Sequence, residues 1–407
     1  MKCNIWDYEK RALPDILSFI VDNRGKTVPT TNSGHILIAT NCVRNENLFP
    51  SYDKVRFLSE ETYQHWFRAH PMPGDILFVC KGTPGRVCMV PDPVDFCIAQ
   101  DMVALRVNDD IVYNKYLLAV LRSARIQKQI EQTSVGDVIP HFKKSFFDQL
   151  LIPIPPFEIQ RVIGDYYFAF SEKIELNKKI NNHLLEQVVA LYEHLVTESD
   201  WPIVTISDIA QKVAMGPFGS NIKVSTFVSE GVPIISGNHL KEYFLEESEF
   251  NYITAEHAER LKNSIVLPHD IIFTHAGNIG QVAMIPDTCK YEHYVLSQRQ
   301  FYLRCDKTKV VPEFLLMFFH SAIGQHELLS YANQTGVPSI AQPATNLKKI
   351  AFKCPPFQSQ VIWQEQVCPL IGQYLNNRLE NEKLTKLRDT LLPKLMSGEL
   401  DVSNISL

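Results

Sequence analysis

Two short segments carry residue types that are used in base chemistry: Ile154–Phe157 and Cys354–Phe357 both end in Pro-Pro-Phe. Enzymes that methylate amino groups of DNA bases place Asp, Asn or Ser before Pro-Pro-aromatic, because that side chain accepts a hydrogen from the flipped base while the ring stacks on it. Neither Ile nor Cys accepts a hydrogen as a carboxylate or an amide does, and no glycine-rich cofactor loop joins a strand to a helix. The sequence therefore argues against intrinsic methyltransferase activity. We interpret each Pro-Pro pair as the stop before a long helix.

Histidines, cysteines and carboxylates form no metal-binding or hydrolytic pattern in this sequence. His65 and His70 are five residues apart, which is not the spacing of two ligands on one helical face, and the nine cysteines include no Cys-x-x-Cys pair. Cys80, Cys88 and Cys97 lie in apolar segments and are interpreted as small core residues. We predict reduced thiols, no metal site and no catalytic residues.

Two turns, Gly82–Gly85 and Gly277–Gly280, have a Gly-x-x-Gly spacing that is compatible with phosphate binding. Neither has the Gly-Lys-Ser/Thr ending of a nucleotide P-loop, and as hairpin turns they need no function. Side chains in and beside these turns nevertheless carry donors that suit phosphates or base edges. The candidates for DNA contact in these turns are Lys81, Thr83, Arg86, Asn278 and Gln281.

Further candidates for DNA contact come from the loop 216–223 and its first-half counterpart, from turns after predicted strands, and from a lysine pair. Arg pairs with guanine and Gln with adenine through two hydrogen bonds, and Lys suits phosphate. The ordinary alternatives are a surface loop, a buried structural amide and a solvated lysine pair. These candidates are Arg24, Gly25, Lys26, Gln100, Lys143, Lys144, Gly219, Ser220, Asn221, Lys223, Gln298 and Arg299.

The elements that must position these residues occur twice in the chain. Residues 72–92 and 267–287 share ten of 21 positions, which are Pro73, Asp75, Ile76, Phe78, Gly82, Gly85, Val87, Met89, Pro91 and Asp92. Tyr116–Ala124 matches Phe314–Ala322, so the repeat extends further along both halves. Short β-branched and aromatic runs, bounded by Gly and Pro, predict strands beside a few short helices. We predict two mixed α/β (α+β) globular heads that share one topology.

After each Pro-Pro pair, Gly and Pro become rare for about 40 residues. Apolar residues there follow a heptad-like spacing, from Ile163 to Leu195 and from Trp363 to Leu395. Such helices would be about 50 to 60 Å long at 1.5 Å per residue. We predict two long, coiled-coil-like helices that pair antiparallel and give the molecule an approximate internal twofold symmetry.

Both heptad patterns are interrupted by asparagines at two successive seam positions, which are Asn177, Asn181, Asn377 and Asn381. Amide layers that face each other would fix the register of the two helices at some cost in stability. The alternative is that these asparagines face solvent. We predict the register role.

Charge and hydropathy limit what the chain can do alone. The net charge is −5, and residues 1–155 carry 18 basic against 17 acidic side chains, while residues 199–354 carry 13 against 15. DNA affinity needs local positive charge, so it must come from loop patches or from a partner. No apolar run reaches the roughly 18 residues of a membrane span, and Met1–Asp7 lacks the features of a signal peptide. We expect a soluble protein of the cytoplasm.

The chain resembles, over essentially its whole length, the DNA specificity subunits of type I restriction-modification systems. The resemblance is carried by the repeated Pro-x-Asp-Ile-x-Phe segments with their Gly-x-x-Gly turns, the loop 216–223, the paired Pro-Pro-Phe segments and the ending 387–400. It implies target-recognition domains at 1–155 and 199–354, and helical spacer regions at 156–198 and 355–407. In one departure, Asp22–Lys26 stands where the second half has Gly216–Ser220, so the two heads are not expected to read the same sequence.

The resemblance implies a non-catalytic reader of double-stranded DNA that works inside a larger enzyme. Each head would read one half of a bipartite, asymmetric site in the major groove, with half-site centres about one DNA turn, roughly 34 Å, apart. The helices would set the unread gap and dock two modification subunits, and it stays open whether restriction subunits join them. No cofactor is expected on this chain; S-adenosylmethionine, ATP and Mg belong to the partners in a prokaryotic cell. The alternatives are a chain with its own DNA methyltransferase or nuclease activity, and a scaffold that binds only proteins.

Overall fold

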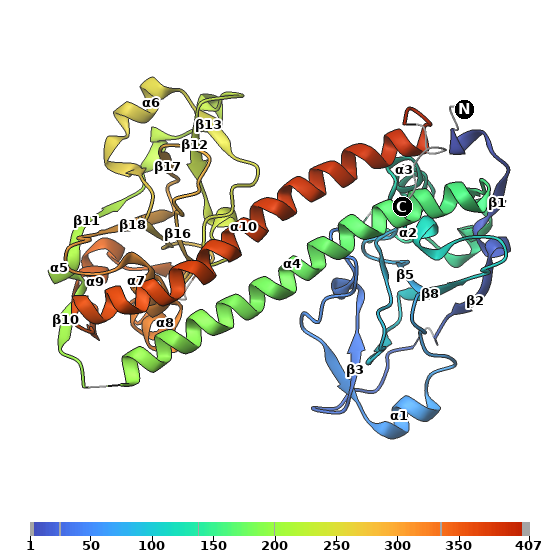
Figure 1. Cartoon of the computed structure of the whole chain (residues 1–407), viewed down its shortest axis with the longest axis horizontal. Coiled ribbons are helices and arrows are strands. Elements are labelled where there is room, and N and C mark those ends of the chain that lie inside the picture. The colour runs from blue at the N-terminus through green and yellow to red at the C-terminus, as the bar shows by residue number, and fades with distance from the viewer. Residues whose placement is uncertain (1–3, 24–25, 137, 199, 334–335, 401–407) are drawn as a thin grey trace. The chain divides into compact units, whose positions relative to one another are not determined.

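The computed structural model describes residues 4–23, 26–136, 138–198, 200–333 and 336–400. The chain forms two compact units (Figure 1). Unit 1 comprises Met1–Ile180 and Asn377–Leu407, and unit 2 comprises Asn181–Asn376. Each unit holds one globular head and a part of both long helices.

The head of unit 1 is built on a four-stranded antiparallel sheet in the order β2-β8-β5-β6. Its strands are β2 (Leu17–Val21), β8 (Met102–Val107), β5 (Ile76–Val79) and β6 (Val87–Met89). A second sheet has the order β4-β3-β7, and β3 runs parallel to β7. The other elements of this head are β3 (His35–Ile38), β4 (Arg56–Leu58), β7 (Phe96–Ile98), β1 (Lys10–Ala12) paired with β9 (Leu151–Pro153), α1 (Glu60–His65), α2 (Asn114–Arg122), α3 (Ala124–Thr133) and the 3-10 helix η4 (Lys144–Gln149).

The head of unit 2 repeats this architecture. Its main sheet has the order β11-β18-β15-β16, with β11 (Ala210–Met215), β18 (Gln300–Cys305), β15 (Ile271–Thr274) and β16 (Val282–Met284). Its second sheet has the order β13-β12-β17-β14, with β12 parallel to β17. The other elements are β12 (Val232–Ile235), β13 (Asn251–Ile253), β14 (Ile265–Val266), β17 (Tyr294–Leu296), β10 (Ile203–Thr205) paired with β21 (Ala351–Lys353), β19 (Ala332–Asn333) paired with β20 (Ser339–Ile340), α5 (Ile206–Ile209), α6 (Ala255–Arg260), α7 (Pro312–His320), α8 (Ala322–Leu329) and α9 (Pro343–Lys349).

The strand register is also repeated, which confirms the predicted fold duplication. Ile76 pairs with Met89 on one side and Leu105 on the other, and Ile271 pairs with Met284 and Leu303 in the same way. The 21-residue sequence repeat therefore contains the hairpin of each main sheet that joins an inner strand to an edge strand, β5-β6 in unit 1 and β15-β16 in unit 2. These hairpin strands are buried along their whole length, which explains their continuous apolar runs.

The repeated aspartate at the start of each hairpin is structural. Asp75 accepts two hydrogen bonds from the Arg106 guanidinium, both at 2.9 Å, and a third from the backbone N–H of Met72 at 2.8 Å. Asp270 accepts from Arg304 at 2.8 and 2.6 Å in the equivalent arrangement. Each carboxylate is only 2% exposed, so these buried pairs tie the edge of the hairpin strand to the neighbouring strand.

The two long helices are α4 (Phe157–Thr197) and α10 (Phe357–Met396), and both begin directly after a Pro-Pro pair. This confirms the interpretation of Pro-Pro as a helix boundary, and 41 and 40 residues correspond to about 60 Å each. A glutamine in the first turn fixes each start: Gln160 accepts from the N–H of Tyr113 at 2.8 Å, and Gln360 accepts from the N–H of Val311 at 3.0 Å.

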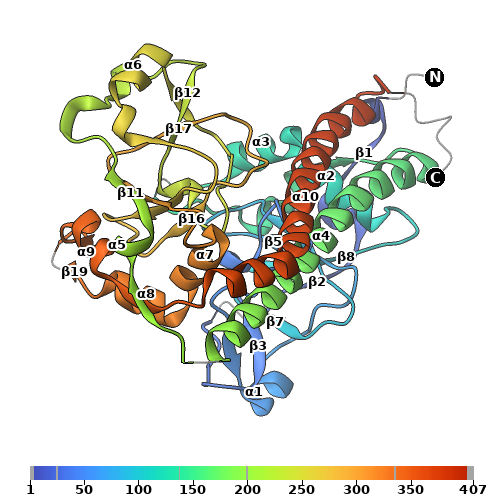
Figure 2. The same ribbon diagram turned by 60° about the vertical axis from the view of Figure 1, so that its left-hand side comes forward.

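The long helices pair within each unit, and both ribbon views show them side by side (Figures 1 and 2). In unit 1, Arg388 of α10 donates to Ser171 of α4 at 3.4 Å, and further along α4 Asn177 bonds to Asn381 at 2.9 Å. Contacts move backward along α10 as they move forward along α4, so the pairing is antiparallel as predicted. The compact units thus divide each helix between them. The functional division into 1–155, 156–198, 199–354 and 355–407 stays a prediction.

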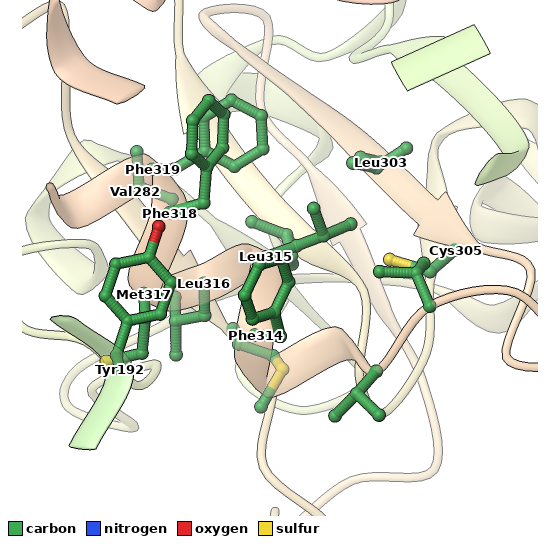
Figure 3. Close-up of a cluster of buried hydrophobic side chains, with 14 of the residues drawn as sticks. Tyr192, Val282, Leu303, Cys305, Phe314, Leu315, Leu316, Met317, Phe318 and Phe319 are labelled. Atoms are coloured by element: carbon green, nitrogen blue, oxygen red, sulfur yellow. The ribbon is translucent and has the colours of Figure 1, made fainter. Parts of the chain in front are cut away.

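Both helices complete the core of the second head. Every residue of α7 from Pro312 to Phe319 is buried, as expected for a helix that is apolar on all sides. The ring of Phe314 lies 5.4 Å from that of Tyr192 on α4 and 6.2 Å from that of Trp363 on α10. Figure 3 shows Tyr192 turned toward the α7 side chains. The head and its segments of α4 and α10 therefore fold as one hydrophobic unit.

The seam asparagines Asn177, Asn181 and Asn381 have side-chain hydrogen bonds to the opposite helix of their own unit. In unit 1, Asn177 donates to Asn381 and to the Glu380 carboxylate at 2.7 Å, and Asn381 donates to the carbonyl of Ile174 at 3.4 Å. In unit 2, Asn181 donates to the carbonyl of Tyr374 at 3.1 Å. The fourth, Asn377, is buried. This geometry is the one that facing amides would give, and the register role itself stays a prediction.

Removing one of these amides should cost more than removing an exposed one. Asn177→Ala removes the donor to the Asn381 side chain and one of two partners of the Glu380 carboxylate, which keeps Lys173, and we expect a loss of about 1 to 3 kcal/mol of unfolding free energy. Urea unfolding followed by circular dichroism measures this loss. The matched control is Asn376→Ala, at an exposed position of α10. Equal effects of the two substitutions would contradict the register role.

Candidate nucleic-acid interface

In both heads the candidate loops lie at one end of the main sheet. In unit 1 this end holds the last residues of β2 and β5 and the first residues of β6 and β8. In unit 2 it holds the last residues of β11 and β15 and the first residues of β16 and β18. Antiparallel pairing brings these strand ends together. We call the groups loop cluster 1 (residues 22–23, 80–86, 100–101 and 139–144) and loop cluster 2 (residues 216–223, 275–281 and 297–299).

Loop cluster 2 is held together by hydrogen bonds between its three segments. The side-chain amide of Gln298 donates to the carbonyls of Gly219 and Ile222. The backbone N–H of His275 donates to the carbonyl of Arg299 at 2.9 Å. The structure therefore brings together three groups of candidates that are far apart in the sequence.

The guanidinium of Arg299 is exposed, and within the described residues it makes no hydrogen bond or ion pair. It lies beside Gly277, where a Cβ atom would stand 3.4 Å from the Arg299 Nη1 atom. That distance is an ordinary van der Waals contact, so glycine is favoured here by its φ of +89° and not by the space that Arg299 needs. The other exposed candidates of this cluster are Gly219, Asn221, Lys223, Asn278 and Gln298, while the side chain of Ser220 lies outside the described part.

Gln281 differs from the other candidates, because its amide is used inside the head. It donates to the carbonyl of Gly237 at 3.0 Å and accepts from the hydroxyl of Thr274 at 3.1 Å. Gln281 therefore supports the loop rather than presenting a free amide, which is the structural role that the sequence left open for the glutamines.

Loop cluster 1 has the same construction. The backbone N–H groups of Cys80 and Lys81 donate to the carbonyl of Asp101 at 2.8 and 3.3 Å, and the N–H of Gly82 donates to the carbonyl of Pro140 at 2.9 Å. In unit 2 the equivalent bond joins the N–H of Gly277 in loop cluster 2 to the carbonyl of Pro338, outside the cluster. Because backbone hydrogen bonds fix the loops in both clusters, the side chains on these loops can differ between the heads without a change in loop conformation.

Most of the candidate side chains of the first head have no assigned internal role. Those without a side-chain hydrogen bond or ion pair to the described residues are Lys26, Lys81, Thr83, Arg86, Gln100 and Lys143. Lys144 instead forms a partly exposed ion pair with Asp22, so its charge is balanced by a carboxylate of the same cluster. Arg24 and Gly25 lie outside the described residues.

The Gly-x-x-Gly turns are anchored by glutamines of the short helices behind them. Gln127 of α3 donates to the carbonyl of Gly85 at 2.8 Å, and Gln325 of α8 donates to the carbonyl of Gly280 at 3.0 Å. Both second glycines have a φ near +87°, which only glycine adopts without strain: the values are +86° and +88°. The turns are therefore rigid platforms for the side chains between the glycines.

Asp101 is a candidate that the sequence reasoning missed. Its carbonyl accepts from the strand end of β5 as that of Arg299 does from β15, so the two residues occupy equivalent turns before β8 and β18. Asp101 is exposed and has a φ of 73°, a left-handed conformation that is unusual for a residue other than glycine. Extending the repeat to Gln100–Arg106 and Gln298–Arg304 would have found it. The two heads thus present opposite charges at one position.

The thiols in and near loop cluster 1 are buried. Burial raises the pKa of Cys80, Cys88 and Cys97 to about 12 in each case, so the nucleophilic thiolate is not formed at neutral pH. Among the described residues, no group of three or more His, Cys, Asp or Glu side chains is arranged to hold a metal ion.

One histidine of unit 2 is held neutral by burial. His320, at the end of α7, bonds to the carbonyl of Val282 at 3.0 Å and stacks on Tyr243 at 3.9 Å. Burial lowers the pKa of His320 from about 6.5 to about 4. Below pH 6.5 the unfolded chain therefore binds a proton that the folded head does not.

Unit 2 should lose stability as the pH falls from 6.5 to about 4, because of His320. We expect a slope of up to about 1.4 kcal/mol per pH unit from this residue. His320→Gln keeps a donor for Val282 but cannot be protonated, so its stability should fall less steeply over that window. Thermal melting between pH 7 and 4 measures the difference, with His326→Gln on the exposed face of α8 as control. Parallel curves for wild type and His320→Gln would refute the assignment.

Two α/β heads of one topology, each with a rigid loop cluster that presents donors and charges at the same sheet end, define a duplicated recognition protein. A family model described as "Type I restriction modification DNA specificity domain" matches residues 7–186 and again 198–388. The chain belongs to this family of type I restriction-modification DNA specificity subunits.

Individual comparisons agree with this membership. The chain is 23% identical to the type I restriction enzyme MjaIX specificity subunit of Methanocaldococcus jannaschii over 364 residues, covering 82% of this chain and 79% of that protein. It is 20% identical to the MjaVIII specificity subunit of the same organism, covering 76% and 75%. The crystal structure of the type I restriction-modification S subunit from M. genitalium superimposes with a TM-score of 0.58 at 16% identity, covering 96% of both chains, which shows the shared fold.

The family membership states what the chain does in general terms. It is a specificity subunit that recognises the DNA target of a type I restriction-modification system, and it is a recognition protein rather than a catalyst. It assembles with other subunits of that system and with DNA. No helix in the described ranges is long and apolar enough to cross a membrane.

Proposed function

We propose that each head reads one half of a bipartite, asymmetric DNA site through its loop cluster, and that the chain thereby directs adenine methylation and restriction by partner subunits. The observation that carries the proposal is the pair of equivalent turns. The same backbone bonds hold Asp101 in one head and Arg299 in the other, so one scaffold presents different chemistry to each half-site.

The side chains on these turns suit base edges in the major groove. Arg299 can donate two hydrogen bonds to O6 and N7 of guanine, and Asp101 can accept from N4 of cytosine. Lysines of the clusters suit phosphates, which position a protein on DNA without reading sequence. These lysines are Lys81, Lys143 and Lys223, and Lys26, outside the clusters, is a further candidate.

Charge supports a role for partners in DNA binding. The chain carries a net charge of −5, and phosphate contacts supply much of the affinity of DNA-binding proteins. We propose that two modification subunits dock on α4 and α10, bring S-adenosylmethionine and methylate adenine at N6. Restriction subunits that use ATP and Mg would join this complex, this chain would bind no cofactor, and the assembly would act in the cytoplasm of a prokaryotic cell. The relatives named as specificity subunits support this proposal.

Genome-wide mapping of N6-methyladenine tests the proposal. Cells with this gene and its neighbouring modification gene are compared with cells that lack only this chain. We expect a bipartite motif with a fixed unread gap that disappears with the chain. Methylation that is unchanged by its loss would overturn the proposal.

A further inference from the structure

The first head is attached to α4 at two levels. At the first, Ile163 and Tyr167 of α4 pack in the hydrophobic core of the head. At the second, Glu175 accepts from the backbone N–H of Leu48 at 3.3 Å, and Lys178 donates to the side chain of Asn47 at 2.9 Å. Tyr167 and Lys178 are 11 residues apart, which is about 16 Å along a helix. The attachment at the second level includes hydrogen bonds, whose strength depends on their direction.

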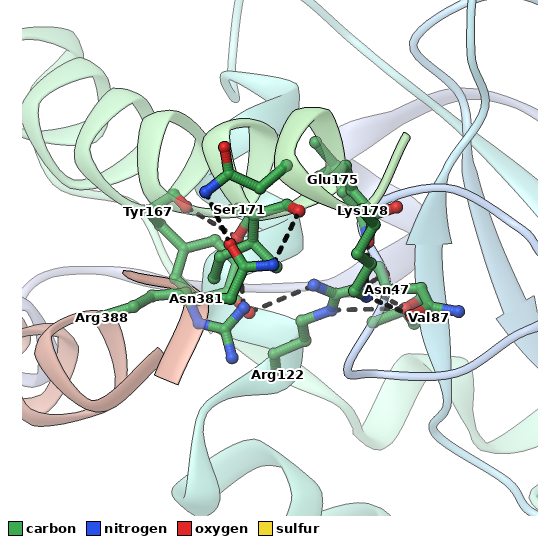
Figure 4. A network of polar contacts seen from close by, with 12 residues as sticks. Asn47, Val87, Arg122, Tyr167, Ser171, Glu175, Lys178, Asn381 and Arg388 are labelled. Carbon is green, nitrogen blue, oxygen red and sulfur yellow. Dashed lines mark hydrogen bonds and ion pairs between the residues drawn. The ribbon is translucent and has the colours of Figure 1, made fainter. Parts of the chain in front are cut away.

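Arg122 of α2 joins the two levels (Figure 4). Its guanidinium donates to the carbonyl of Val87 on β6 at 2.8 Å, to the carbonyl of Asn47, and to the hydroxyl of Tyr167 at 3.2 Å. Arg388 of α10 lies over the ring of Tyr167 in a cation–π contact, with its guanidinium carbon 5.4 Å from the ring centroid. The hairpin strand that leads from loop cluster 1 is thus linked to both long helices of unit 1.

The second head uses different chemistry at the equivalent place. His320 stands where the first head has Arg122, and burial keeps it neutral. The loop that corresponds to residues 45–49 has a ring contact with α10: Phe244 is fully buried and its ring lies 5.7 Å from that of Tyr374.

We propose that Asn47, Leu48, Glu175 and Lys178 form a polar latch that fixes the tilt of the first head on α4 and so limits the gap length that the chain accepts between half-sites. The inference rests on the proposed function. Helix length sets the gap coarsely, and the latch decides whether the head can shift by one base-pair step of about 3.4 Å. These are positioning residues, since none of them belongs to loop cluster 1.

The latch can be removed without removing the core contacts. Asn47→Ala with Glu175→Ala deletes the two hydrogen bonds between the loop and α4, and it leaves Ile163, Tyr167 and the contact of Lys179 with the Phe49 ring in place. A milder second variant is Lys178→Met, because that side chain is 42% exposed and its loss disturbs packing little. The matched control is Glu172→Ala, an exposed glutamate on the same helix.

The experiment measures methylation by the complete complex on duplexes with the mapped half-sites separated by the natural gap or by one base pair more or less. We expect both latch variants to raise methylation at the altered gaps about tenfold relative to the natural gap, since one charge-assisted hydrogen bond is worth roughly one tenfold step. Glu172→Ala should keep the wild-type gap preference, and both half-site sequences should stay unchanged.

Two results would overturn the latch. The first is a wild-type gap preference in both latch variants while they methylate the natural site. The second is equal loss of methylation at every gap in both, because that would show a purely structural role. A wild-type complex that shows no bipartite preference would instead overturn the proposed function, so the two failures are distinguishable.

Discussion

Arg299→Ala should relax sequence preference at a single base pair in the half-site read by the second head and leave the other half-site intact. The guanidinium is exposed, has no partner among the described residues and sits on a turn that Gln298 and His275 hold rigid. A bidentate contact to guanine is worth about 1 to 3 kcal/mol of discrimination, or roughly 5- to 150-fold. Methylation of a duplex library with that half-site randomised measures the change.

The matched control for this substitution is Arg260→Ala, an exposed arginine at the end of α6 that lies outside loop cluster 2. It should leave both half-sites unchanged. Loss of preference at both halves after Arg299→Ala would mean that the residue acts through folding or non-specific binding. An unchanged motif would exclude Arg299 from base reading.

The equivalent position in the first head offers an internal comparison. Asp101→Asn removes the charge but keeps a carbonyl acceptor, and it should alter only the half-site read by the first head. The two substitutions together should affect the two halves independently, because the turns belong to different units. A single common effect would place both residues outside base recognition.

Much of the fold could be predicted because local patterns determine it. The repeat around Asp75 and Asp270 predicted two heads of one topology, and the Pro-Pro pairs predicted where α4 and α10 begin. The heptad spacing predicted a buried seam, since burial repeats at that period whatever the partner is. Ile163 and Val367, both fully buried, lie on this predicted seam.

The site could be predicted less completely, because its chemistry depends on partners far away in the sequence. Lys144 forms an ion pair with Asp22, which is 122 residues away, and the Gln281 side chain bonds to the carbonyl of Gly237 inside the head. No local pattern distinguishes these residues from Lys143 or Asn278, which stay exposed. Asp101 was missed since a carboxylate does not suggest DNA contact until its equivalence to Arg299 is seen.

Asp270→Ala should destabilise the main sheet of unit 2 by about 3 kcal/mol, at the lower end of the cost of breaking a buried ion pair. The carboxylate is 2% exposed, and its removal leaves the Arg304 guanidinium and the N–H of Leu267 without their acceptor. Arg304 is 24% exposed, so water compensates part of the loss. Hydrogen exchange of the full chain should then show faster exchange in β15 and β18.

The duplicated fold supplies the control, because Asp75→Ala breaks the same pair with Arg106 in the other head. Each substitution should loosen its own main sheet and leave the other at the wild-type exchange rate. Asp270→Asn separates the effect of charge from that of hydrogen bonding, because an amide oxygen can still accept from the N–H of Leu267 but carries no charge.

Burial raises the pKa of Asp270, and the hydrogen bond from Arg304 opposes this shift. The buried carboxylate therefore depends on its arginine partner. We therefore expect Asp270→Asn to cost less than Asp270→Ala, and equal exchange rates in the two variants would mean that the charge on Asp270, rather than its hydrogen bonds, holds the hairpin to its neighbour.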